Sequence, residues 1–104
     1  MDQVPDLPAG GFDIAVNVHS FSECTWDAIS WWVDQLRRLQ VPRLFLVPNE
    51  AEGFCPTERD GTRRDATELL EGAGYRLVHE EAVFADPAVR QLLGVHDRFC
   101  LYEL

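Results

Sequence analysis

A nearly unbroken apolar run at residues 12–19, followed at once by a tryptophan-rich amphipathic segment, constrains the fold of this chain most strongly. The run reads Phe-Asp-Ile-Ala-Val-Asn-Val-His and ends in a group of polar residues. Strands of this kind are typical of parallel α/β sheets, in which both faces of the sheet are covered. We therefore expect residues 12–19 to form a buried strand of an α/β sheet.

The segment that follows has the pattern of an amphipathic helix over residues 26–39. Its apolar residues share one broad face and are Trp26, Ile29, Trp32, Val33, Leu36 and Leu39. Ser22 or Thr25 can cap the start of this helix. Trp31 falls on the opposite, polar face, where it is either partly covered by long side chains or marks a contact surface.

The remaining segments complete an alternating pattern. Residues 43–48 are predicted to be a second buried parallel strand, and residues 62–73 a helix that ends in glycines. Residues 75–84 alternate more clearly and indicate a more exposed third strand. Asp86 caps a short helix that closes at Gly94, and residues 98–104 form a last strand antiparallel to the third. At 104 residues, the chain is expected to be a flexible lead-in at 1–11 and a single α/β domain at 12–104.

The charge of the chain limits its partners. The formal net charge is −9, which is unfavourable for binding nucleic acid or an anionic membrane surface. We expect neither kind of partner. The start of the sequence lacks the pattern of a signal peptide, and no apolar stretch approaches the ~18 residues of a membrane span. A cytoplasmic location is therefore expected.

Three cysteines, Cys24, Cys55 and Cys100, are too widely spaced for a typical zinc motif or a disulfide framework. We expect reduced, mostly buried thiols and no metal site. One alternative stays open, in which His19 activates Cys24 as a nucleophile.

The order strand, helix, strand, helix, strand, strand resembles the C-terminal half of Rossmann-like S-adenosylmethionine-dependent methyltransferases. The resemblance covers nearly the whole chain from residue 12 to residue 104. FDIAVNVHSFSE stands at the family's fourth strand, RLFLVPNE resembles its fifth strand, and GAGYRLVHEEAVF with RFCLYEL resembles its closing hairpin. The implied fold is a partial Rossmann-like methyltransferase sheet, with two parallel strands, a C-terminal antiparallel hairpin and helices packed on the sheet.

Within this family, the segment Asn-Val-His-Ser-Phe-Ser-Glu is most similar to bacterial enzymes that methylate hydroxyl groups of sugars or other small molecules. It departs from the Asn-Pro-Pro-aromatic motif of enzymes that methylate nucleobase amino groups. The resemblance thus implies S-adenosylmethionine as cofactor and a small-molecule hydroxyl as acceptor.

Polar residues that end the two parallel strands are expected to meet at one rim of the sheet. There His19 is the candidate general base, and Glu23 either orients it or faces the substrate. Asn17 and Ser20 are candidates for the cofactor, and Asn49 and Glu50 for the acceptor. For His19 and Glu23 a structural role, at a strand–helix junction and near a helix N-terminus, remains open. His79 and His96 have no convincing partner in the sequence.

The family's glycine-rich loop and acidic ribose-binding residue have no counterpart before residue 12. We expect an excised piece of a larger enzyme, with little or no activity as an isolated chain. The alternative is a stand-alone, non-catalytic interaction or regulatory module that uses Trp31 and the open sheet edge. If the strands that precede this one in the family are truly absent, the first strand becomes an exposed apolar edge, and we then expect a homodimer formed through it.

Overall fold

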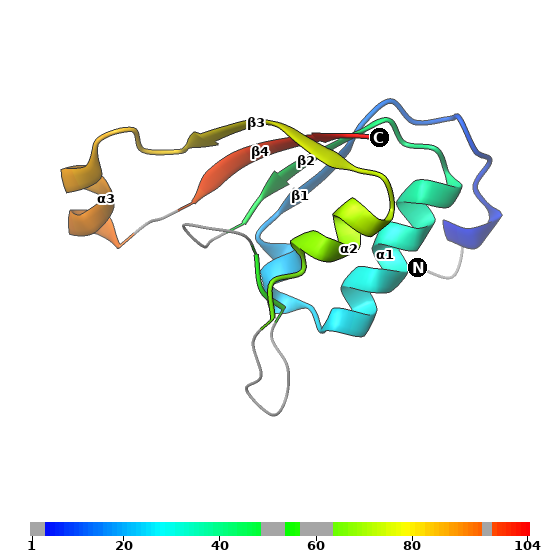
Figure 1. The fold of residues 1–104 in the computed structure, drawn as a ribbon, viewed down its shortest axis with the longest axis horizontal. Helices are drawn as coiled ribbons and strands as arrows, with labels where there is room; N and C mark the ends of the chain where they lie inside the picture. The colour runs from blue at the N-terminus through cyan, green and yellow to red at the C-terminus, as the bar shows by residue number, and fades with distance from the viewer. Residues whose placement is uncertain (1–3, 49–53, 57–63, 95–96) are drawn as a thin grey trace.

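The computed structural model describes residues 4–48, 54–56, 64–94 and 97–104 of the chain (Figure 1). Short 3-10 turns precede and follow the first strand, and helices and strands then alternate. In chain order the elements are η1 Val4–Asp6, β1 Ala15–Val18, η2 Ser20–Glu23, α1 Trp26–Arg38, β2 Arg43–Val47, α2 Thr67–Gly72, β3 Arg76–Ala82, α3 Pro87–Leu93 and β4 Arg98–Glu103.

The strands form one mixed open sheet in the order β1-β2-β4-β3. β1 and β2 run parallel, whereas β4 runs antiparallel to both of its neighbours. The predicted parallel pair and the predicted antiparallel pairing of the last two strands are therefore confirmed. In its described residues the chain is a small α/β domain with a four-stranded mixed sheet and three α-helices.

Local capping explains where helices α1 and α3 begin. The side chain of Thr25, rather than Ser22, accepts a hydrogen bond from the backbone N–H of Ala28 at 3.3 Å, so α1 starts at the next residue. Asp86 caps α3 in the same way through the N–H of Ala88, and Gly94 ends it in the left-handed region at φ 67°. Both helices thus lie where the sequence predicts them.

Helices α1 and α2 lie on the same side of the sheet and build the core with it (Figure 1). Ile29 and Val33 of α1 are buried against alternate residues of β2 and β4. These inward-facing strand residues are Leu44, Leu46, Cys100 and Tyr102. Burial of this face is the main source of stability for so small a domain.

The burial predicted for the first strand on both of its faces is wrong. β1 is the outermost strand of the sheet, and Val16 and Val18 are 62% and 55% exposed. Within the described ranges, both helices of the core pack on the other face of the sheet. On the inner strand β2, the side chain of Phe45 is partly covered, because its ring stacks on that of Phe99 of β4 with 5.8 Å between the ring centroids.

Helix α2 begins later than predicted, at Thr67 rather than at residue 62. Residues 62 and 63 lie outside the described residues, but residues 64–66 are described and are not helical. They have other partners: the backbone N–H of Ala66 donates to the carbonyl of Phe54, and the side-chain carboxylate of Asp65 accepts from the N–H of Phe54. This tie to the preceding loop competes with helical hydrogen bonding.

Residues 4–11, predicted as a flexible lead-in, are tied to the end of α1. The Arg38 guanidinium donates to the backbone carbonyls of Val4 and Leu7, at 2.8 and 3.1 Å. The N–H of Gly10 donates to the carbonyl of Leu39. These contacts hold the lead-in against the helix layer.

Candidate functional site

His19 follows β1 directly, at the carboxyl end of the parallel pair. Its backbone N–H donates to the carbonyl of Val47, the last residue of β2, at 2.9 Å. Its φ of 64° lies in the left-handed region, which is uncommon for residues other than glycine. This conformation turns the chain sharply from β1 into η2, and such backbone geometry is enriched at functional sites.

The side chain of His19 reaches across the end of the sheet to Asp97, which precedes β4. Its Nε2 lies 2.5 Å from Asp97 Oδ2, and the two side chains are 44% and 17% exposed. An ionised carboxylate can only accept a hydrogen bond, so neutral His19 must carry its proton on Nε2. Nδ1 then carries a lone pair that can accept a proton, as in catalytic bases oriented by a carboxylate.

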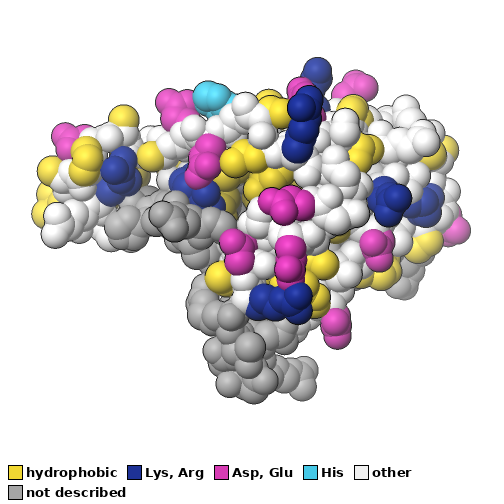
Figure 2. All heavy atoms as spheres, in the orientation of Figure 1, with side chains coloured by type: hydrophobic (Ala, Val, Ile, Leu, Met, Phe, Trp, Pro, Cys, Tyr) yellow, Lys and Arg dark blue, Asp and Glu magenta, His cyan; other side chains and the backbone are white. Residues whose placement is uncertain are grey.

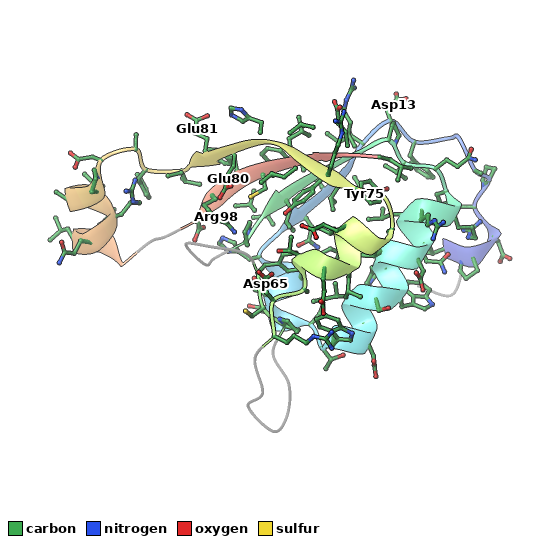
Figure 3. The ribbon with its side chains drawn as sticks, viewed as in Figure 1. Asp13, Asp65, Tyr75, Glu80, Glu81 and Arg98 are labelled. Atoms are coloured by element: carbon green, nitrogen blue, oxygen red, sulfur yellow. The ribbon has the colours of Figure 1, made fainter. Side chains whose placement is uncertain are left out.

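Arg98, which follows Asp97 in the chain, belongs to a second pair of side chains. Arg98 forms an ion pair with Glu80 of β3, and its side chain is only 11% exposed. Figure 3 shows the two side chains directed toward one another, with Asp65 nearby and Glu81 projecting from the other face of the sheet. The rim thus has two side-chain pairs, in each of which one member is exposed (His19 and Glu80) and the other largely covered (Asp97 and Arg98).

Asn17 and Ser20 are bonded to each other. The amide of Asn17 donates to the hydroxyl oxygen of Ser20 at 2.8 Å, and its carbonyl oxygen accepts from the N–H of Phe21 at 3.1 Å. These bonds stabilise the turn of η2 after β1. The Ser20 hydroxyl hydrogen is not used in this pair and can donate elsewhere.

The same two residues lie at an open, mainly apolar pocket of about 400 Å³ beside the sheet edge. Residues from β1, η2, α1 and β2 line it, and they are Ala15, Val16, Asn17, Ser20, Phe21, Cys24, Trp32, Leu36 and Leu44. A pocket with apolar walls and a few polar groups is the usual form of a small-molecule site.

Glu23 ends η2 and is exposed, and the carboxylate bonded to His19 is that of Asp97. The predicted role of Glu23 stays a prediction. Asn49 and Glu50, the predicted acceptor-binding pair, lie outside the described residues, as does His96. Cys24 lines the pocket, whereas the ring of His19 is directed to Asp97.

His79 and Trp31 each make a contact with a nearby residue of the chain. His79 lies on exposed β3 with its Nε2 3.4 Å from a Glu81 oxygen, so its partner is local. Trp31 is half-buried and meets Trp32 edge to face at 4.8 Å. Part of its surface remains available for a contact.

Burial sets the pKa of the groups behind the rim. It raises the pKa of the Cys100 thiol, and it raises the pKa of Tyr102 to about 12. Burial also acts to raise the pKa of Asp65, but hydrogen bonds from Thr67 and Phe54 outweigh it, so that pKa lies below its ordinary value. At neutral pH, Cys100 and Tyr102 therefore remain protonated, and neither is a candidate base.

Sequence reasoning missed Asp97, which lies 78 residues from His19. One signal could have found it. Asp97 directly precedes a strand predicted to run antiparallel, and the start of such a strand lies at the edge where the parallel strands end. Arg98 could have been found by the same argument.

No protein-family model, curated protein or solved structure matches the chain. In the part of the chain that the structure describes, no three acidic, histidine or cysteine side chains gather as a metal site would require. Over the same residues, none of the helices is both long and apolar enough to span a membrane. Figure 2 shows acidic and basic side chains interspersed on the face that it presents.

Proposed function

We propose that this chain is the C-terminal part of an S-adenosylmethionine-dependent methyltransferase that methylates a hydroxyl group of a sugar or other small molecule. The His19–Asp97 pair at the carboxyl end of β1 carries the proposal. Removal of a hydroxyl proton is the step for which an unactivated acceptor needs a base, and Nδ1 of His19 carries a lone pair that can accept this proton.

The arrangement of the strands supports the same proposal. The resemblance implies two adjacent parallel strands followed by a closing hairpin, and β1, β2 and the β3–β4 pair have this arrangement. Ligands of open α/β sheets gather outside the carboxyl ends of the parallel strands, where His19 lies. The Rossmann-like identity of the sheet belongs to the proposal.

The residues present fit only a part of the cofactor. The pocket offers aromatic and aliphatic walls from Phe21, Trp32 and Leu36, with Asn17 and Ser20 as polar groups, which suit a planar base. Among the described residues, no carboxylate lines it to bind ribose hydroxyls. When bound, the cofactor supplies an electrophilic methyl group on a sulfonium.

In this mechanism the protein aligns the acceptor and removes its proton. Nδ1 of His19 accepts the hydroxyl proton while Asp97 keeps the ring oriented and stabilises the imidazolium that forms. Glu23, Asn49 and Glu50 are proposed to contact the acceptor. Because the lining of the pocket is incomplete for the cofactor, we expect little or no turnover by the chain alone.

Free thiols at Cys24, Cys55 and Cys100 support a reducing compartment, and the cytoplasm is the proposed location. The proposed partner of the complete enzyme is the small-molecule acceptor. Nucleic acid and membranes are not proposed as partners, since the net charge is −9.

Titration with S-adenosylmethionine, followed by calorimetry and by amide NMR, tests the proposal. We expect affinity in the millimolar range, about −4 kcal/mol, with shifts confined to residues around Asn17 and Ser20. Asn17→Asp keeps the oxygen that accepts from Phe21 but loses the amide donor, so it should weaken binding without loss of fold. Leu92→Ala, on exposed α3, is the control. Silence of the wild-type chain would refute the cofactor assignment.

The orientation of His19 has its own test. Long-range ¹⁵N–¹H spectra distinguish the two neutral tautomers, and we expect the Nε2–H form in the wild type. Asp97→Asn can donate as well as accept, so the preference for one tautomer should be lost. A mixed population in the wild type would contradict the proposed base.

The second candidate is a non-catalytic interaction or regulatory module. The exposed edge of β1 and the half-buried Trp31 favour it, since both offer contact surface. This candidate requires no cofactor binding, so the same titration separates the two.

A further inference from the structure

Among the residues that the structure describes, no strand pairs with the outer edge of β1. His19 N–H points to β2, and alternation along the strand directs the N–H and C=O groups of Asn17 and Ala15 the same way. The corresponding groups of Val16 and Val18 then face outward, beyond the edge of the sheet. Such an edge is a template for another strand.

The two edges of the sheet differ in how they are protected. β3, at the far edge, carries Arg76, His79, Glu80 and Glu81, and its pairing with β4 has an irregularity between Leu77 and His79. Charges and bulges are the devices by which edge strands avoid pairing. β1 reads Ala-Val-Asn-Val and has neither.

We propose that a second copy of this chain pairs with β1 as an antiparallel strand, about a two-fold axis that places Val16 opposite Val16. The sheet would then run through both copies as eight strands. This interface does not rest on the proposed methyltransferase function, because a non-catalytic module would have the same edge. It does share Val16 and Asn17 with the pocket proposed for the cofactor.

The register follows from the outward backbone groups. Val16 can exchange both of its hydrogen bonds with Val16 of the second copy, because both of its backbone groups face the edge. On the same face, Val18 lies opposite Ile14, and on the helix side Ala15 lies opposite Asn17. The apolar residues paired in this way are 48% exposed at Ile14, 62% at Val16 and 55% at Val18.

Self-pairing is favoured because this edge is complementary to itself. A two-fold register shifted by one residue would centre on Asn17, whose amide is already bonded to Ser20 and Phe21. It would also place Ile14 opposite Ser20 instead of Val18. Although the chain has a net charge of −9, no residue of Ala15–Val18 is charged, so the like charges of two copies do not meet within the paired strands.

Sedimentation equilibrium at tens of micromolar tests the proposal. We expect the wild type at twice the 11.8 kDa of one chain. Val16→Lys should sediment as a monomer, because two lysines would lie opposite one another, and the exposure of Val16 allows the variant to fold. Leu92→Lys, at an 85% exposed position on α3, should remain a dimer. A monomeric wild type, or a dimer lost with Leu92→Lys and kept with Val16→Lys, would overturn the proposal.

A cysteine crosslink tests the register. Residues opposite one another in a hydrogen-bonded antiparallel pair have Cα atoms about 5.5 Å apart, a separation that a disulfide spans. In a Cys24→Ser, Cys55→Ser background, Val16→Cys should form a covalent dimer upon mild oxidation. Leu92→Cys should stay monomeric on denaturing gels. Equal crosslinking of the two variants, or none in Val16→Cys, counts against this register.

Discussion

One buried hydrogen bond allows a quantitative test of how the turns that follow α1 and α2 are held together. The hydroxyl of Tyr75, a residue only 1% exposed between α2 and β3, donates to the backbone carbonyl of Val41 at 2.6 Å. Val41 lies between α1 and β2, so the bond connects the two turns that position the helices on the sheet. Tyr75→Phe removes the donor and leaves the ring.

The expected loss of unfolding free energy is about 1.5 kcal/mol, within the range of roughly 1–3 kcal/mol for leaving a buried acceptor unsatisfied. In a domain of this size each kcal/mol lowers Tm by roughly 4–8 °C. Tyr75→Ala would remove the ring as well and should lose about 3–5 kcal/mol, by analogy with other buried aromatic residues.

Urea unfolding followed by tryptophan fluorescence measures these changes, because all three tryptophans lie on α1. Tyr102→Phe is the matched control: Tyr102 is 5% exposed, and its hydroxyl has no hydrogen bond to the residues that the structure describes. We expect the control to change the unfolding free energy by less than about 0.5 kcal/mol, the usual range for substitutions that break no specific contact. Equal losses in the two variants would show that the bond to Val41 is not the cause.

Three more outcomes are expected. Asp65→Ala should lose about 1–2 kcal/mol at pH 7, since three donors lose their acceptor. Because the pKa of Asp65 is lowered in the folded chain, the stability that its carboxylate contributes is fully present above the ordinary value of 3.8. This stability is lost as the pH falls through the folded-state pKa, so the acid unfolding curves of wild type and variant should converge. Burial raises the pKa of both tyrosines, and it raises that of Tyr102 to about 12. Phenolate absorbance should therefore appear only above pH 10, and the free energy of unfolding should fall as the pH rises from 10 toward 12. Phenolate in the folded chain below pH 10 would contradict this. Gly94→Ala should destabilise the chain by about 1 kcal/mol in thermal unfolding, because φ 67° is strained for alanine; an unchanged Tm would argue against that turn.

The parts of the fold that could be predicted from the sequence depend on local interactions. The start of α1 after Thr25 and the limits of α3 between Asp86 and Gly94 follow from caps within three residues of each terminus. The sequence predicted a more exposed position for β3, and all of its residues except Ala82 are exposed.

The candidate site was predictable only in part. His19 was predicted as a candidate because polar residues at the carboxyl end of a parallel strand lie where such sheets bind ligands. Its partner was not, since Asp97 reaches it only when β4 pairs with β2. The roles predicted for Asn17 and Ser20 stay predictions, and their hydrogen bond to each other is a feature of the folded turn.

The sequence by itself determined the order of helices and strands and their caps, because those depend on periodicity and on contacts a few residues apart. Only the tertiary structure decided that β1 lies at an edge with Val16 exposed, that α2 starts at Thr67, and that Asp97 bonds to His19. Each of these depends on which distant segments lie side by side, and pairing between strands is set by the whole sheet rather than by either strand alone.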